Sequence, residues 1–371
     1  MEITGEIQSI KYKQKLSDTK YEEYDISGLK KALEKESKFL LNVDTINKIV
    51  VSRWVSAKRT RSYPYARVYD ILPYAGKKIA VIPIYKDEGR DGDRDYLQWD
   101  TISLMSLLGV NVIISYYNKA DKKKNYENKI TNQRFDVEHV LSEIKKLVSY
   151  KSCALHWNLE QVANITDLLQ TAVESYKKIS SVTKVNMHLE QEISEKIKLL
   201  KENKENFINM SRKASEKAQS REILTIQPKE KINSDEKSKI TISNYLGGYY
   251  YFTVDEARIS DENNNNNRNF RKAIDLVEAK HSSKGKFPSL ADIKDGLIKM
   301  MLYSNLKKVY VNGEKNGESE EYEVNPVLKL TSDNPGKLNS KQSQNLKLLK
   351  EEAELNGFYI EYTEYTGREC E

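Results

Sequence analysis

Hydrophobic and polar positions in the C-terminal third of the chain alternate in ways that predict a series of strands and helices. Residues 240–243 and 248–255 are rich in β-branched and aromatic side chains and flank the glycine-containing break at 244–248, as the strands of a hairpin do. A third strand is expected at 273–282. The segment 288–303 then carries apolar residues every three or four positions, which indicates a helix with one buried face.

The pattern continues to the C-terminus. Ser289 is a suitable N-cap for the 288–303 helix, with Asp292 three residues later. A strand is expected at 307–311, a second helix at 339–355 and a last strand at 358–362. The predicted order is therefore hairpin, strand, helix, strand, helix, strand.

The third predicted strand carries an acid and a lysine on the same face. Glu278 and Lys280 are two positions apart, so they project to one side of an extended chain. Asp255 ends the preceding strand and would meet Glu278 if the two strands pair. Two adjacent carboxylates suit a small hard cation such as Mg²⁺, which polarises a phosphodiester and activates water. Lys280 would orient that water or stabilise developing charge.

The residues Asp255 and Glu278-Ala-Lys280, in this order of elements, resemble the active-site signature of the PD-(D/E)XK nuclease superfamily, and most closely its type II restriction endonucleases. The resemblance covers residues 235–371. It implies an α/β (α+β) fold with a central mixed sheet flanked by helices, and Mg²⁺-dependent cleavage of double-stranded DNA. It also implies a homodimer and a cognate DNA methyltransferase as its functional partner in the cell.

Two departures from the superfamily pattern leave the upstream acid open. No proline precedes Asp255, and an asparagine-rich run at 261–268 separates it from Glu278. Glu256 and Asp261 are therefore alternatives to Asp255 as a metal ligand. Asp275 is a weaker candidate, because three positions from Glu278 on one strand puts it on the opposite face.

Composition limits the classes of protein and of site to which the chain can belong. The chain has 371 residues, a net charge of +6 and two cysteines, Cys153 and Cys370. Their separation, without Cys or His partners at zinc spacing, argues against a disulfide framework or a zinc site. No apolar run of about 18 residues occurs and no signal-peptide core is visible, so a cytoplasmic protein without membrane contact is expected.

Three regions are predicted along the chain. They are an N-terminal α/β region at 1–150, a helical region with a linker at 151–234 and the catalytic core at 235–371.

The N-terminal region contains two basic segments that fit a DNA-binding role. The first, at 52–67, has no acidic residue and interleaves aromatic side chains with its cations. The second, at 118–134, suits electrostatic attraction of phosphates. The candidate DNA-binding residues are Arg53, Lys58, Arg59, Arg61, Arg67, Lys123 and Lys124.

The region 70–117 imitates the nuclease order with its own strand, lysine, helix and strand. Asp70 and Lys86 stand where an acid and a lysine would, but position 84 is isoleucine instead of a carboxylate. A second site here would need an acid supplied by Asp95 or Asp100. Without one, this region would be a degenerate second core that docks DNA.

Three alternative functions share parts of this pattern. A non-specific or repair nuclease of the same superfamily would use the same acids without reading bases. A non-enzymatic DNA-binding protein would use only the basic segments. A structural protein would depend on the charged, helix-forming stretch at 188–219 and show no salt-dependent affinity for DNA.

Overall fold

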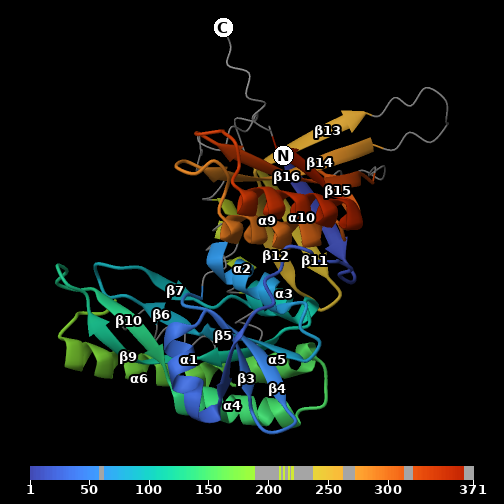
Figure 1. Ribbon diagram of the computed structural model, residues 1–371. Coiled ribbons are helices and arrows are strands. Elements are labelled where there is room, and N and C mark those ends of the chain that lie inside the picture. The colour runs from blue at the N-terminus through green and yellow to red at the C-terminus, as the bar shows by residue number, and fades with distance from the viewer. Residues whose placement is uncertain are drawn as a thin grey trace. The chain divides into compact units, whose positions relative to one another are not determined.

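The chain folds into a mixed α/β protein made of two compact units, shown in Figure 1. The computed structural model describes residues 1–57, 62–188, 237–261, 272–312 and 321–362, with a few single positions between 209 and 220. Unit 1 contains residues 1–18 and 214–371, and unit 2 contains residues 19–213. Across the described residues, no helix is long and apolar enough to cross a membrane.

Unit 2 is built on a five-stranded sheet in the order β2-β3-β4-β5-β8. Only the pair β3 and β4 is antiparallel. The last two strands are buried along nearly all of their length, which agrees with the continuous apolar runs expected of central parallel strands. The strands are β2 (Glu22–Asp25), β3 (Lys38–Asn42), β4 (Lys48–Arg53), β5 (Lys77–Pro83) and β8 (Asn111–Ser115).

Two small antiparallel ribbons extend unit 2, and helices cover its sheet. The ribbons are β6 (Tyr85–Asp87) with β7 (Arg94–Tyr96), and β9 (Tyr117–Lys122) with β10 (Ile130–Phe135). The helices are η1 (Ile26–Gly28), α1 (Leu29–Lys35), α2 (Ser62–Ile71), α3 (Trp99–Leu107), α4 (Val137–Ser149), α5 (Ala154–Ala163) and α6 (Ile165–Thr183). The expected helical stretch after residue 154 is thus two helices that meet at Asn164, and both belong to unit 2. The stretch 188–219 lies almost wholly outside the described residues.

Unit 1 contains two four-stranded sheets. The first has the order β12-β11-β1-β15, so the N-terminal strand pairs in parallel with β11 more than 230 residues later. Its strands are β12 (Tyr249–Val254), β11 (Ser238–Asn244), β1 (Glu2–Ile7) and β15 (Lys307–Val311). The second has the order β13-β14-β16-β17, made of β13 (Glu256–Asp261), β14 (Lys272–Ser282), β16 (Glu323–Ser332) and β17 (Tyr359–Tyr362).

Two helices pack beside the second sheet. Helix α9 (Leu290–Tyr303) contacts β14 and β16, and α10 (Ser340–Asn356) contacts β17. Ser289 caps α9 by accepting a hydrogen bond from the Asp292 N–H, as its sequence predicts. Gly296 allows close approach to the sheet, since a Cβ there would lie 2.7 Å from Leu328 Cδ1 and 3.2 Å from Lys280 Cε.

The mixed α/β class is confirmed, but the expected pairing of the Asp255-bearing strand with β14 is wrong, and β16, which the sequence pattern did not predict, lies beside β14. The strand that pairs antiparallel with β14 is β13, which the sequence pattern did not reveal, and β12 belongs to the other sheet. The strand at 307–311 also joins the other sheet, and β16 takes the place beside β14. A proline inside β16, Pro326, weakens the strand signal of that segment.

Candidate active site

Asp255 lies at the bend between β12 and β13. The pairing of β12 with β11 ends just before it, and the pairing of β13 with β14 begins just after it. The pairing of Ser238 with Val254 places Lys237 next to Asp255, and the pairing of Glu256 with Val277 places Asp255 next to Glu278. The Ala279 N–H donates to Asp255 Oδ2 at 2.8 Å. This bond holds the carboxylate of Asp255 against the strand residue that separates Glu278 from Lys280.

Glu278 is buried and paired with two lysines. Its Oε1 lies 2.8 Å from Lys280 Nζ, and Lys299 Nζ donates to its Oε2 at 2.6 Å. Lys280 also donates to Asp295 Oδ2 at 2.6 Å. Asp295 and Lys299 come from α9 and are four positions apart, so one helix face supplies both. Glu278 and Lys280 therefore meet on one face of β14, as their spacing predicts.

The second acid has its own cation. Lys237 Nζ donates to Asp255 Oδ1 at 2.7 Å, and both side chains are almost fully buried. With Lys237 included, three acids (Asp255, Glu278 and Asp295) face three lysines (Lys237, Lys280 and Lys299). Formal charge in this cluster, which we call the acid–lysine cluster, is balanced. Such compensation is needed, because an unpaired charge in a protein interior is costly.

Burial and neighbouring charges raise the pKa of Asp255 and lower that of Glu278. Burial raises the pKa of Asp255, and repulsion from Glu278 raises it further against the attraction of Lys299 and Lys237. Burial would also raise the pKa of Glu278, but Lys280 and Lys299 outweigh it and lower that pKa to about 2. Glu278 is therefore held ionised, while Asp255 takes up a proton more readily than an ordinary aspartate.

The lysine is held in its charged form. Burial alone would lower the pKa of Lys280, but the charges of Glu278 and Asp295 raise it above its ordinary value. Asp295 itself has a pKa raised by burial, against the lowering effect of Lys280. Lys280 is thus a fixed positive charge beside the two acids of the site.

Two polar atoms around the cluster have no hydrogen-bond partner among the described residues. They are Tyr303 Oη, at the end of α9, and Thr253 Oγ1, two residues before Asp255. Burial raises the pKa of the Tyr303 phenol, and the charges of Lys299 and Glu278 act on it in opposite directions. Buried polar atoms of this kind need a partner, and a ligand or water oxygen would supply one.

The donor set fits a magnesium ion. Both candidate ligands, Asp255 and Glu278, offer carboxylate oxygens, and Mg²⁺ in proteins is commonly held by one or two carboxylates, with water and substrate phosphates completing its shell. In the described parts of the chain, no group of three or more His, Cys, Asp or Glu residues could hold a metal ion. The candidate residues thus offer two carboxylates, and water and substrate oxygens would have to complete the shell of a Mg²⁺ ion.

The alternative upstream acids lie elsewhere. Glu256 pairs with Arg258 Nε at 2.9 Å and approaches Lys329 at 3.7 Å, in a cluster that includes Glu361. Asp261 is opposite Lys272 at the far end of β14, six residues from Glu278, which corresponds to roughly 20 Å along a strand. Of the three upstream acids, Asp255 is the one that the structure brings to Glu278.

The candidate DNA-binding residues that the structure describes differ in their surroundings. Lys58, Arg59 and Arg61 lie outside the described residues. Arg53 Nε donates to the Glu36 carbonyl at 2.7 Å, and Arg67 donates to the Arg53 carbonyl, so both guanidinium groups bind backbone within unit 2. Lys123 lines a cavity described below, and Lys124 is exposed.

The nuclease-like residues of unit 2 are tied to separate partners. Asp70 pairs with Lys38 at 3.0 Å, and Lys86 pairs with Glu88 at 2.6 Å. Ser56 donates to the buried carboxylate of Asp95. Asp70 and Lys86 are thus each paired with a different residue of unit 2.

Comparisons with protein-family models, with curated proteins and with solved structures found no match to this chain. The functional assignment accordingly depends on the residues and geometry of the chain itself.

Proposed function

We propose that the protein is a type II restriction endonuclease that hydrolyses DNA phosphodiester bonds in a Mg²⁺-dependent reaction. The observation that carries the proposal is the hydrogen bond from the Ala279 N–H to Asp255. It brings the Asp255 carboxylate to Glu278 and Lys280, although Asp255 and Glu278 are 23 positions apart. Two acids and a lysine at one strand end are the chemistry that the resemblance to PD-(D/E)XK nucleases implies.

Asp255 and Glu278 would hold the Mg²⁺ ion, which when bound polarises the scissile phosphate and lowers the pKa of a water molecule. Lys280 keeps its proton, so its ammonium group can stabilise charge that develops on the phosphate and orient the attacking water. Asp295 positions Lys280 through their 2.6 Å contact. The chain thus supplies the acid pair, a fixed cation and the group that orients it.

Lys299 and Lys237 neutralise the two acids in the structure and would have to give up these contacts to a cation. Lys299 has a second acceptor already in place, because its Nζ also donates to the Thr253 carbonyl at 3.3 Å. Moving fully to that carbonyl would free Glu278 Oε2 without leaving the ammonium group unpaired. Lys299 therefore gives the cluster a way to exchange an internal cation for an external one.

The wider assignment concerns DNA, assembly and cellular role. A twofold-symmetric site in double-stranded DNA is cut on both strands most simply by a homodimer with one metal site in each subunit. Restriction by such an enzyme in the cytoplasm requires a cognate methyltransferase that protects the host DNA. Among the described residues, the candidates for DNA contact are Arg53, Arg67, Lys123 and Lys124.

A non-specific or repair nuclease with the same acid pair is the second candidate. It is favoured by the contacts of Arg53 and Arg67, whose guanidinium groups are used on backbone carbonyls of unit 2. Arginines so engaged are less available to read base edges.

Digestion of a sequenced plasmid with the purified full-length protein and Mg²⁺ tests the proposal. We expect discrete fragments whose sequenced ends share one short motif. Random ends would support the non-specific nuclease. Salt-dependent DNA binding without any cleavage would support a non-enzymatic DNA-binding protein.

A further inference from the structure

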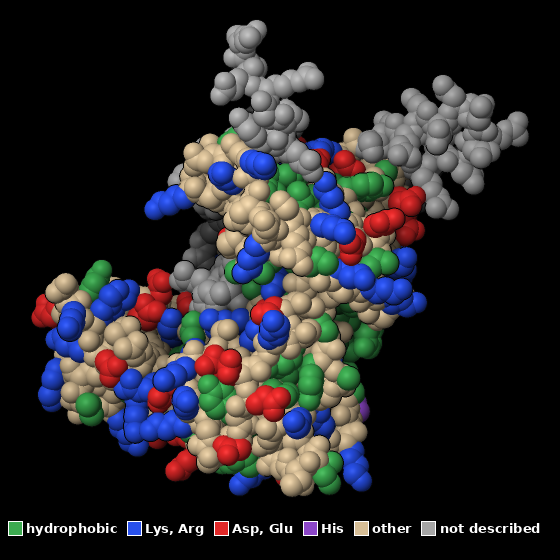
Figure 2. Space-filling view, viewed as in Figure 1, with side chains coloured by type: hydrophobic (Ala, Val, Ile, Leu, Met, Phe, Trp, Pro, Cys, Tyr) green, Lys and Arg blue, Asp and Glu red, His purple; other side chains and the backbone are tan. Residues whose placement is uncertain are grey.

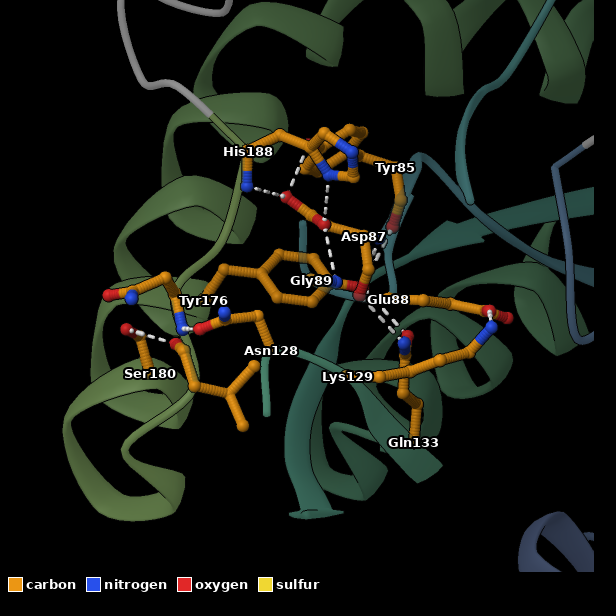
Figure 3. A network of polar contacts seen from close by, with 12 residues as sticks. Tyr85, Asp87, Glu88, Gly89, Asn128, Lys129, Gln133, Tyr176, Ser180 and His188 are labelled. Carbon is orange, nitrogen blue, oxygen red and sulfur yellow. Dashed lines mark hydrogen bonds and ion pairs between the residues drawn. The ribbon is translucent and has the colours of Figure 1, made fainter. Parts of the chain in front are cut away.

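Strand β6 of unit 2 separates two polar clusters by the ordinary alternation of strand side chains. Tyr85 and Asp87 face one side, where Asp87 accepts hydrogen bonds from Tyr85 and from the His188 backbone and approaches the His188 ring. Lys86 and Glu88 face the other side. Figure 3 shows this division, with Asp87 directed to His188 and Glu88 directed to Lys129.

A cavity of about 520 Å³ opens on the side of Lys86 and Glu88. Its walls come from α1, the end of β4, β6, β9 and β10. Five cationic side chains and two acidic ones line it, which leaves a formal excess of three positive charges. The cations are Arg53, Lys86, Lys123, Lys129 and Arg134, and the acids are Glu34 and Glu88. On the face of unit 2 seen in Figure 2, Lys and Arg side chains gather in the region of these elements.

Glu88 holds two of these cations in place. Its carboxylate lies 2.6 Å from Lys86 Nζ and 3.3 Å from Lys129 Nζ, and all three side chains are mostly buried. Burial would raise the pKa of Glu88, but its hydrogen bonds and attraction to Lys86 and Lys129 lower it below its ordinary value. One carboxylate shared between two ammonium groups leaves most of their donor capacity for another acceptor.

The cavity is backed by a fixed amide. Gln133 Nε2 donates to the Asp87 carbonyl at 2.8 Å, and Gln133 Oε1 accepts from the Tyr176 hydroxyl at 2.8 Å. Two of the lining lysines, Lys123 and Lys129, place Nζ 4.6 and 5.6 Å from the ring centre of Tyr126, an exposed side chain outside the lining. The site therefore combines two cations that share a carboxylate with a wall amide fixed by two hydrogen bonds.

We propose that this cavity binds a phosphate-bearing ligand of about mononucleotide size, with its phosphate on Lys86 and Lys129. The volume lies within the range of roughly 300–1,000 Å³ typical of small-molecule sites. Excess positive charge selects an anion, and compact ammonium groups suit the oxygens of a phosphate. The ligand is either a free nucleotide or a nucleotide of a nucleic-acid strand. The proposal requires no nuclease activity and concerns residues that the acid–lysine cluster does not contain.

Equilibrium binding without divalent metal tests this site separately from cleavage. The full-length protein would be titrated by calorimetry with deoxyadenosine 5′-monophosphate, and by fluorescence anisotropy with a labelled 20-base-pair duplex in EDTA. Lys86→Gln and Lys129→Gln should each raise the Kd by about tenfold, the size expected for a lost charged hydrogen bond. Glu88→Gln should increase the affinity, since it removes the negative charge that competes with a phosphate for Lys86 and Lys129.

Lys145→Gln is the matched control, because it removes one exposed cation from α4, which does not line the cavity. Circular dichroism of each variant checks that unit 2 is folded. Binding of the mononucleotide that depends on Lys86 and Lys129 identifies a free nucleotide as a ligand. Dependence seen only with the duplex identifies a nucleic-acid strand. Equal losses in Lys145→Gln, or no binding of either probe, would overturn the proposal, whereas absent cleavage would bear only on the nuclease assignment.

Discussion

Two strands of this protein carry an acid and a lysine separated by one residue, and they have become different kinds of site. On β14 of unit 1, Glu278 lies 2.8 Å from Lys280, and on β6 of unit 2, Lys86 lies 2.6 Å from Glu88. The side chains on β14 are 3% and 13% exposed, whereas Glu88 and Lys86 are 20% and 17% exposed. The same spacing gives the same contact, so the contact alone does not define the function.

The neighbours of each pair make the difference. Strand β14 lies between β13 and β16, and the bend before β13 delivers a second acid, Asp255, to Glu278. Strand β6 pairs with β7 alone in its ribbon, and the residue delivered to Glu88 is another cation, Lys129. Two acids together favour a metal ion, and an excess of cations favours a phosphate. We therefore propose that the different tertiary contacts suit one local motif to catalysis and the other to anion binding.

The largest effect is expected from removing the lysine of β14. Lys280→Ala should lower the single-turnover cleavage rate by about 10²-fold or more and hardly change DNA affinity, because the ammonium group acts on charge that develops in the transition state. Rapid-quench cleavage at saturating DNA measures the rate. Lys284→Ala is the control, since Lys284 is exposed in the loop after β14. An equal fall in rate for Lys86→Ala would transfer the chemistry to unit 2.

An effect of comparable size, on stability, should distinguish the two clusters. Lys299→Met leaves the buried carboxylate of Glu278 with one lysine fewer and should cost about 3 kcal/mol, as breaking a buried ion pair does. Lys129→Met removes one partner of Glu88, which is 20% exposed against 3% for Glu278, and should cost less than Lys299→Met. Urea unfolding followed by far-UV circular dichroism gives both values. Equal costs would mean that the two carboxylates do not differ in burial or pairing.

Tryptophan fluorescence separates the units in the same experiment. All three tryptophans, Trp54, Trp99 and Trp157, are in unit 2. Destabilisation by Lys299→Met should therefore appear in circular dichroism more than in fluorescence if the units unfold independently.

The smallest expected effect is a pH dependence specific to Asp255. Its pKa is raised in the folded protein, so the folded state binds the proton more tightly than the unfolded chain. The stability contributed by Asp255 should rise as pH falls from neutrality through this raised pKa. Glu278 has the opposite sign, and its contribution is lost only as pH falls from about 4.5 toward its folded pKa of about 2.

Urea unfolding of the wild type and of Asp255→Asn over a pH series from 7.5 down to 4 isolates the contribution of Asp255 to stability. The wild type should gain stability relative to the variant as pH falls, because the variant has no carboxyl group to protonate. A difference that stays constant or shrinks over the series would contradict the burial and repulsion assigned to Asp255.

Local patterns in the sequence predicted the elements better than the pairing. Helix α9 is as expected, because its cap at Ser289 and its apolar stripe are signals within one segment. The pairing of β1 with β11 brings together residues more than 230 positions apart, and no local pattern records it. The strand β13 is largely polar and precedes the asparagine-rich run, so it carries little strand signal and its pairing with β14 was missed.

The candidate site was predicted in part. The shared face of Glu278 and Lys280 follows from strand geometry, and the structure confirms it. Lys299 and Asp295 were missed, because along the sequence they read as ordinary polar positions of a helix. The sequence held one weak indication of their role. Asp295 and Lys299 are charged and four positions apart, so they share one face of a helix that is buried on most sides. Lys237 precedes the first predicted strand of the core at 240–243, and only the β11–β12 register brings it to Asp255.

The most direct test of the central claim is cleavage by Glu278→Gln. The substitution keeps the shape of the side chain and removes the charge that would help to hold Mg²⁺. Plasmid cleavage with Mg²⁺ and duplex binding in EDTA should be measured on the same preparation, beside the wild type. We predict that cleavage is abolished and that DNA binding stays near the wild-type value. Full cleavage by Glu278→Gln would contradict the account and move the search for the catalytic acids to the cluster around Lys86.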